Sequence, residues 1–170
     1  MPKPIELRLK VGDKAPEFSA PAAGGKKVAL ADLAGKSVVL YFYPKDDTPG
    51  CTKEACSFRD EFSALEKKGA VVLGVSTDSV TSHDKFAAKH KLPFALLADE
   101  DRGIARAYGV WGPKTFMGRK YEGVHRVTFL IGPDGRIQKI WPAVKPQGHA
   151  AEVLAALGQG GAGEPREEKG

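Results

Sequence analysis

Two continuous apolar runs, rich in β-branched and aromatic side chains, dominate the first half of the chain. They are VVLYFYP, from Val38 to Pro44, and VVLGVST, from Val71 to Thr77. Runs of this kind are typical of strands that are buried on both faces of a sheet. Between them lies an apolar stripe with helical spacing, formed by Ala55, Phe58, Phe62 and Leu65. It predicts a helix that stops at Gly69, and the order strand, helix, strand predicts a parallel pair with a right-handed crossover.

The pattern predicts two further helices and a third strand in the next segment. A helix from about Ser82 to His90 is ended by Pro93, because proline cannot continue a helix. The run FALLAD, residues 94–99, predicts a strand, and DRGIARAYG predicts a short helix closed by Gly109. Near the N-terminus, FSAPAAGGKKVALADLAGK predicts a small hairpin that precedes these elements.

The last third of the chain has a different pattern, because VTFLIG and RIQKIW flank the turn Pro133–Gly135. This arrangement predicts an antiparallel hairpin, so the sheet is expected to be mixed. A C-terminal helix from His149 to Leu157 is expected to end at Gly158. We therefore predict one α/β domain over residues 1–158, with a mixed central β-sheet flanked by helices. The Gly, Pro and charge content of residues 159–170 predicts a disordered C-terminal tail.

Composition narrows the class of protein. Two cysteines in 170 residues are too few for a disulfide framework, and the N-terminus lacks the apolar core of a signal peptide, so we expect a cytoplasmic protein. No apolar run approaches the roughly 18 residues of a membrane span, so we expect no membrane partner. The net charge is +5, but the 26 Lys and Arg residues are interspersed with 21 Asp and Glu residues. Without a basic block or a recognition motif, we expect no nucleic-acid partner.

Two sequence patterns could suggest a cofactor site or a metal site, but neither has the residues and spacing that such a site requires. The GKS of Gly35–Ser37 looks like the end of a phosphate-binding loop, but Leu30 replaces the required glycine and a predicted strand follows where a helix is needed. The cysteines lack C-x-x-C spacing, and the histidines are dispersed, so we expect no metal site and no cofactor. Each histidine is expected at the surface or on a helix face: His83, His90, His125 and His149.

Both cysteines lie within the stretch YFYPKDDTPGCTKEAC, residues 41–56. Cys51 follows a Thr-Pro-Gly turn at the carboxyl end of a predicted buried strand, so it falls in the first turn of the next helix. Unpaired backbone N–H groups and the positive end of the helix dipole stabilise a thiolate at such a position. Because its neighbours are polar, the sequence predicts a reactive Cys51, not an inert buried thiol.

The stretch FYPKDDTPGCTKEACSFRD resembles the active-site segment of the peroxiredoxins, in particular the atypical two-cysteine group called bacterioferritin comigratory protein or peroxiredoxin Q. VVLGVSTDSVTSHDKFAAKHKLPFALLAD, ARAYGVW and HRVTFLIGPDGRI resemble the same family in the same order, so the similarity extends from about Leu9 to Leu157. The resemblance implies a thioredoxin-like fold and reduction of hydrogen peroxide and organic hydroperoxides. It also implies regeneration by thioredoxin or a similar dithiol reductant.

The resemblance implies a role for each matching residue. Cys51 corresponds to the peroxidatic cysteine, which becomes a sulfenic acid, and Cys56 corresponds to the resolving cysteine, which forms an intramolecular disulfide with it. Pro44, Thr48 and Arg126 correspond to the residues that shape the pocket. A thiolate that attacks a peroxide must expel hydroxide or alkoxide, so preorganised hydrogen-bond donors should stabilise the transition state.

The chemistry of these side chains fits such roles. The Thr48 hydroxyl can accept from one peroxide oxygen and donate to the other, while the amides of Gly50 and Cys51 point into the same space. Pro44 presents no N–H and shields the site from water. Arg126 offers a fixed charged fork that stabilises the thiolate and holds the peroxide.

Two other functions remain open at this point. One is a dithiol/disulfide oxidoreductase that resembles thioredoxin, although such proteins use C-x-x-C and four residues separate the cysteines here. The other is a peroxide-sensing thiol protein, which the same chemistry permits. Glu54 also fits the family motif, as a residue of the helix start or of a hydrogen-bond network. Because both cysteines lie in one segment, a monomer suffices for disulfide formation.

The spacing of the cysteines has a mechanical consequence. If Cys51 and Cys56 share one regular helix, five residues give a rise of about 7.5 Å and a rotation of about 140°, so their Cα atoms lie about 8.7 Å apart. A disulfide allows no more than about 7 Å. The sequence therefore predicts that the first turns of the helix unwind before Cys56 can reach Cys51.

Overall fold

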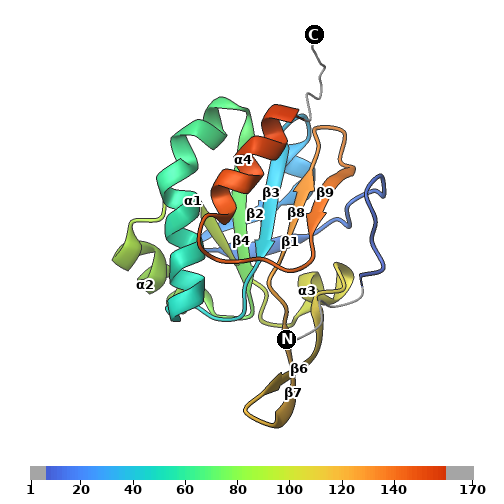
Figure 1. Ribbon diagram of the computed structural model, residues 1–170. Coiled ribbons are helices and arrows are strands. Elements are labelled where there is room, and N and C mark those ends of the chain that lie inside the picture. The colour runs from blue at the N-terminus through green and yellow to red at the C-terminus, as the bar shows by residue number, and fades with distance from the viewer. Residues whose placement is uncertain (1–6, 160–170) are drawn as a thin grey trace.

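In the computed structural model, which describes residues 7–159, seven strands form one mixed sheet in the order β2-β1-β5-β4-β3-β8-β9 (Figure 1). The strands of this sheet are β1 (Ser19–Ala22), β2 (Lys26–Ala29), β3 (Ser37–Phe42), β4 (Ala70–Ser76), β5 (Ala95–Ala98), β8 (Val127–Ile131) and β9 (Ile137–Trp141). The α/β class and the mixed sheet predicted from the sequence are confirmed.

The strands at the centre of the sheet pair in parallel, and the strands at both edges pair antiparallel. β3 pairs with β4 and β4 pairs with β5 in parallel, while β8 runs antiparallel to both β3 and β9. β3 is buried on both faces, as its continuous apolar run predicts. Val38, Leu40 and Phe42 belong to one core layer, and Val39 and Tyr41 belong to the other.

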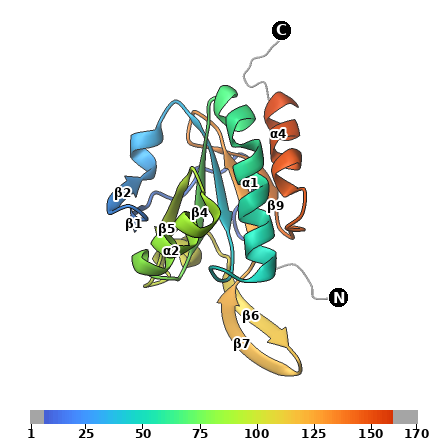
Figure 2. The same ribbon diagram turned by 90° about the vertical axis from the view of Figure 1, so that its left-hand side faces the viewer.

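Helices cover the two faces unequally. α1 (Pro49–Lys67), α2 (Val80–His90) and α4 (His149–Gln159) contribute to the same core layer, and Figures 1 and 2 show α1 and α4 side by side over the sheet. The short α3 (Gly103–Ala107) packs with the N-terminal segment on the other face, through Ile104 and Ala105. The loop of residues 43–48 joins the carboxyl end of β3 to α1 at one end of the sheet.

The N-terminal hairpin predicted from the sequence is present as β1 and β2. These strands pair from Ser19↔Ala29 to Ala22↔Lys26, and Ala22 also pairs with Leu97 of β5. The hairpin thus forms one edge of the main sheet, and a 3-10 helix, η1 (Leu30–Leu33), leads from it towards β3.

The segment WGPKTFMGRKYEG, for which the sequence analysis predicts no element, forms a second sheet. β6 (Trp111–Phe116) and β7 (Arg119–Val124) pair antiparallel and project from the body of the molecule in Figures 1 and 2. The turn consists of Met117 and Gly118, both with positive φ. Asn-Gly and Asp-Gly are the usual signals of such a turn, and these strands have no continuous apolar face, so the pattern gave no indication of the hairpin.

The C-terminal helix extends further than predicted. α4 runs through Gly158 to Gln159, because a glycine weakens a helix without necessarily ending it. Gln159 is the first residue of the predicted disordered tail, and residues 160–170, the rest of that tail, lie outside the described residues.

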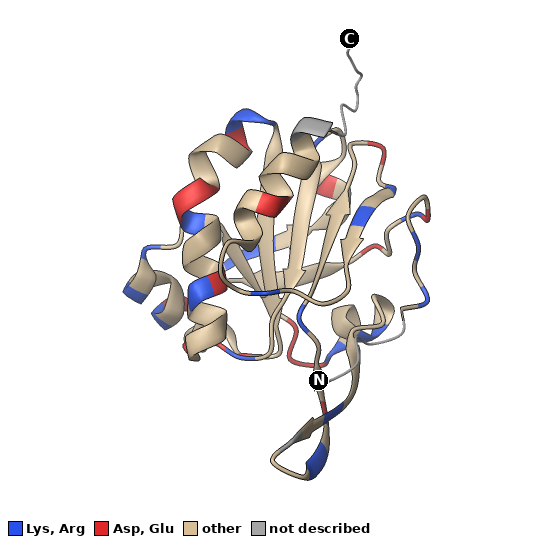
Figure 3. Ribbon diagram, viewed as in Figure 1, with Lys and Arg blue, Asp and Glu red and all other residues tan. Residues whose placement is uncertain are grey.

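Charges of both signs are interspersed over the helices and loops, as their order in the sequence predicts (Figure 3). Among the described residues, no helix has both the length and the apolar character needed to cross a bilayer.

Candidate active site

The start of α1 is arranged so that backbone donors remain available. Thr48 is the N-cap residue, but its hydroxyl donates to the Lys45 carbonyl oxygen at 3.0 Å and makes no side-chain cap. Pro49 has no N–H, and the amides of Gly50 and Cys51 have no carbonyl acceptor within the helix. The expectation that Thr48 donates to a peroxide oxygen is therefore wrong in this arrangement, because its hydrogen is directed to Lys45. Its oxygen lone pairs and the two amides are the groups at the helix start that a ligand can meet.

Cys51 and Arg126, which lie 75 positions apart in the sequence, are in direct contact. Arg126 immediately precedes β8, the strand that pairs with β3, so sheet pairing brings it to the start of α1. Its Nη2 donates to Cys51 Sγ at 3.3 Å, and its Nη1 donates to Glu54 Oε1 at 2.6 Å. Cys51 is 1% exposed, so the guanidinium faces a thiol that is almost completely shielded from solvent.

Glu54 is a buried acid of the site with a raised pKa. It lies one helical turn after Cys51 and is completely buried, and Oε2 has no hydrogen-bond partner among the described residues. Burial raises the pKa of Glu54 to about 7, although the Arg126 charge and hydrogen bond act in the opposite direction. The network role expected of Glu54 is therefore present, in the form of an ion pair with Arg126. The signal available in the sequence is the spacing of three residues from Cys51, which places both side chains on one helix face.

Gly50 borders the same site, and Pro44 lies in the loop that precedes it. A Cβ atom at Gly50 would lie 3.2 Å from Arg126 Nη2 and 3.6 Å from Cγ of Pro146, so the glycine permits a close approach of the guanidinium. Pro146, which precedes α4, was not identified from the sequence because the connection to α4 has no recognisable motif. Pro44 is half-buried at the head of the loop that leads from β3 to Thr48.

Cys56 lies in α1 together with Cys51, and both thiols are free. Cys56 is half-buried, five positions along the helix, at an expected Cα separation of about 8.7 Å. The structure therefore brings Thr48, Gly50, Cys51 and Arg126 together, whereas Cys56 lies outside disulfide distance of Cys51 as long as the helix is intact.

Two of the histidines, His83 and His149, lie on helices, which is one of the two placements expected for them. Both are completely buried. The spacing of three residues between His83 and Phe86 indicates this placement in retrospect, since it puts the histidine on the apolar stripe of α2. In residues 7–159, no group of three or more His, Cys, Asp and Glu side chains could hold a metal ion.

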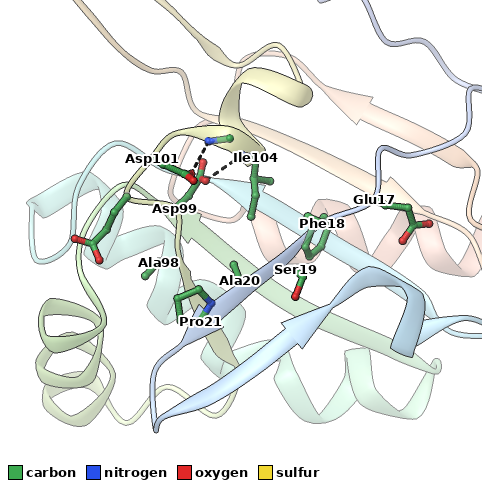
Figure 4. Close-up of a pocket in the computed structure, with 11 residues that line it drawn as sticks. Glu17, Phe18, Ser19, Ala20, Pro21, Ala98, Asp99, Asp101 and Ile104 are labelled. Carbon is green, nitrogen blue, oxygen red and sulfur yellow. Dashed lines mark hydrogen bonds between the residues drawn. The ribbon is translucent and has the colours of Figure 1, made fainter.

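A pocket of about 420 Å³ lies elsewhere, between the β1 segment and the turn before α3 (Figure 4). Two of its acidic residues, Asp99 and Asp101, already have structural partners. Asp99 accepts from the amides of Ile104 and Ala105, and Asp101 accepts from the amide of Gly103. None of its lining residues belongs to α1 or to the segment of Arg126, so the pocket is separate from the Cys51 site.

Comparisons with known proteins agree on one family. The AhpC/TSA family model matches residues 11–140. The chain is 47% identical to peroxiredoxin Bcp of Bacillus subtilis over 151 residues, covering 89% of this chain and 96% of the relative. It is 48% identical to peroxiredoxin Bcp of Escherichia coli K12 over 146 residues, covering 86% and 94%. The solved structure of the Xanthomonas campestris bacterioferritin comigratory protein, described for its alkyl peroxide reduction activity, has a TM-score of 0.82 and 40% identity, covering 91% of this chain and 98% of that one.

Proposed function

The chain belongs to the AhpC/TSA family and is a peroxiredoxin with a thioredoxin-like fold, and we propose that Cys51 is the residue with which it attacks hydroperoxides. The contact between Arg126 Nη2 and Cys51 Sγ, 3.3 Å long, is the observation that carries this assignment. It places a permanent positive charge and a directed donor at the sulfur, in a site that excludes water.

The arrangement supports a single displacement step. The Cys51 thiolate attacks one peroxide oxygen, an S–O bond forms, the O–O bond breaks, and the second oxygen leaves as hydroxide or alkoxide that takes up a proton. Cys51 is then a sulfenic acid and the peroxide has become water or an alcohol. Arg126 and the amides of Gly50 and Cys51 are placed to stabilise the developing negative charge. The lone pairs of Thr48, whose own hydrogen is directed to Lys45, can accept from the protonated peroxide oxygen.

The second half of the cycle requires Cys56. Its thiolate attacks the sulfenic sulfur, an S–S bond forms, the S–O bond breaks, and the hydroxide that leaves takes up a proton to become water. The two-electron oxidation is now held in the Cys51–Cys56 disulfide. Because both residues lie in α1, its first turns must unwind for this step. Thioredoxin, or a similar dithiol, then returns the two electrons by thiol–disulfide exchange. We place this cycle in a cytoplasmic monomer.

The test compares three forms of the protein in a peroxide-consumption assay with thioredoxin, its reductase and NADPH. Cys51→Ser should show no turnover, because no other residue of the site is a nucleophile of this kind. Cys56→Ser should be oxidised once and should carry one added oxygen on Cys51, found by mass spectrometry, whereas the wild type should form the disulfide. Turnover that survives Cys51→Ser would contradict the assignment.

The same assay separates the other two functions that the sequence leaves open. Insulin reduction in the absence of peroxide would indicate a dithiol/disulfide oxidoreductase, and stoichiometric oxidation without turnover would indicate a sensor. Rapid turnover with either hydrogen peroxide or an alkyl hydroperoxide is the expected result.

A further inference from the structure

A second buried cluster lies against the loop that precedes α1, and the mechanism above uses none of its members. Its centre is Asp46, a loop residue that is only 7% exposed. Asp46 Oδ1 accepts from the Tyr43 hydroxyl at 2.5 Å, and Oδ2 accepts from the Ser82 hydroxyl at 2.7 Å. The same Oδ2 lies 2.7 Å from Nδ1 of the completely buried His83. These three partners compensate for the desolvation of a buried carboxylate, which would otherwise be costly.

Both ring nitrogens of His83 have a hydrogen-bond partner. Its Nε2 lies 2.9 Å from the carbonyl oxygen of Leu97, which can only accept a hydrogen bond, so this nitrogen donates. Its Nδ1 lies 2.7 Å from the Asp46 oxygen that also accepts from Ser82. Asp46 and His83 therefore form a buried hydrogen-bonded pair in which every polar atom has a partner.

This cluster fastens the loop to parts of the fold other than α1. His83 and Ser82 belong to α2, Leu97 belongs to β5, and Tyr43 directly follows β3. The Asp46 amide adds a further link, because it donates to Asp78 Oδ2 at 2.8 Å, in the connection between β4 and α2. The described contacts of the Asp46 carboxylate thus include no residue of α1, the helix whose first turns have to unwind.

We propose that Asp46 and His83 are positioning residues, which hold the loop of Pro44 to Thr48 in its peroxide-binding shape while the first turns of α1 fold and unfold. The inference rests on the proposed role of Cys51. Thr48 is two residues after Asp46, and its hydroxyl donates to the carbonyl oxygen of Lys45, the residue before Asp46. Loss of the contact between Asp46 and His83 would let this short segment shift as a unit, and the acceptor on Thr48 would move relative to the Cys51 sulfur.

The test measures the second-order rate constant for oxidation of the reduced protein by hydrogen peroxide in a single turnover. His83→Gln keeps a donor but cannot link the Asp46 carboxylate and the Leu97 carbonyl as the imidazole ring does, and we expect the rate constant to fall roughly tenfold to a hundredfold, as for a displaced reacting group. Ser82→Ala removes one of the three donors to Asp46 at a half-buried position and should cost roughly threefold. Tyr108→Phe is the matched control, because it removes a buried hydrogen bond to the Pro16 carbonyl elsewhere and should keep the wild-type rate.

A double-mutant comparison separates positioning from general stability. In a Thr48→Val background, His83→Gln should have little further effect, because the group that it positions is already gone. An equal rate loss in both backgrounds would overturn the proposal, as would wild-type rates in folded His83→Gln and Ser82→Ala. If His83→Gln does not fold, Ser82→Ala with the same Thr48→Val comparison decides the question.

Failure of the role proposed for Cys51 has a different signature, namely turnover that survives Cys51→Ser, so the two results are distinguishable.

Discussion

At the scale of single residues, Arg126 connects the chemistry of the site with its stability. One guanidinium donates both to the Cys51 sulfur and to the buried Glu54 carboxyl. An ammonium group could not reproduce this fork, because its charge is a point at the end of a flexible chain. Glu54 therefore fixes the direction of the guanidinium, and Gly50 leaves the space that it needs.

Replacing Arg126 by alanine should slow the attack on peroxide about a hundredfold, because one charged transition-state donor is lost. Stopped-flow measurement of Cys51 oxidation gives the rate constant. Arg126→Lys should recover only part of the rate, since it keeps the charge but not the fork. The double variant Arg126→Ala, Glu54→Gln removes the buried unpaired acid and serves as the folding control. A wild-type rate in a folded Arg126→Ala protein would show that Arg126 takes no part in the reaction.

Glu54 should make the stability of the protein depend on pH. Its folded-state pKa of about 7 lies above the ordinary value of 4.5, so the folded protein binds this proton more tightly than the unfolded chain does. The free energy of unfolding should therefore fall as pH rises from about 4.5 to about 7, by about 3 kcal/mol from this group alone. Urea titrations should show this fall in the free energy of unfolding for the wild type, and Glu54→Gln should lack it in the same pH window. Parallel pH profiles would show that Glu54 titrates normally.

At the scale of elements, α1 is divided into a part that can unwind and a part that is anchored. Phe58 is completely buried and stacks on Tyr41 of β3 with ring centroids 4.7 Å apart, and it packs edge-on against Phe94 and His149. The first two turns of the helix lack aromatic anchors of this kind. Unwinding that begins at Cys51 should therefore stop near Phe58, since continuing past it would open the core.

We expect disulfide formation to speed amide hydrogen exchange between Cys51 and Ser57 while the amides from Phe62 to Lys67 stay protected. The cause is the conflict between a helical Cα separation of about 8.7 Å and the limit of about 7 Å for a disulfide. Exchange followed by mass spectrometry in the reduced and oxidised protein measures the effect. Cys56→Ser, treated with one equivalent of peroxide, is the control and should keep the reduced pattern. Identical exchange in the two wild-type states would rule out local unwinding.

At the scale of the whole molecule, the central sheet with its two core layers is distinct from the segment that carries Cys51 and Cys56. Most of the central strands are buried on both faces, and the two core layers pack against opposite sides of the same strands. The site lies at the end of β3, where the chain leaves the sheet, so its first helical turns can open without separating the layers. Both cysteines belong to this one segment of the chain.

The oxidised protein should therefore remain a monomer of 18.2 kDa with its disulfide inside the chain. Sedimentation of the reduced and peroxide-treated protein should give the same mass, and a non-reducing gel should show no disulfide-linked dimer. A dimer that reducing agent dissolves would mean that Cys51 reacts with a thiol of a second copy faster than α1 can unwind.

The sequence by itself determined the elements with strong periodicity and the identity of the reactive segment. β3 and β4 are predicted by continuous apolar runs, because strands buried on both faces have apolar residues at successive positions. α1 is predicted by an apolar stripe with helical spacing, because only one of its faces is buried. The reactivity that we propose for Cys51 also rests on local sequence, since a turn and a helix start within a few residues create the donors that stabilise a thiolate.

Only the tertiary structure decided which distant groups meet. The contact of Arg126 with Cys51 depends on the antiparallel pairing of β8 with β3, and the burial of His83 against Asp46 depends on the packing of α2 over β5. Neither leaves a periodic pattern, because a single polar residue looks the same in sequence whether it faces water or a buried partner. The β6–β7 hairpin was missed for a related reason, since a projecting hairpin without a core face carries no apolar alternation. Contacts between remote polar groups are set by sheet order and helix packing, which local sequence does not encode.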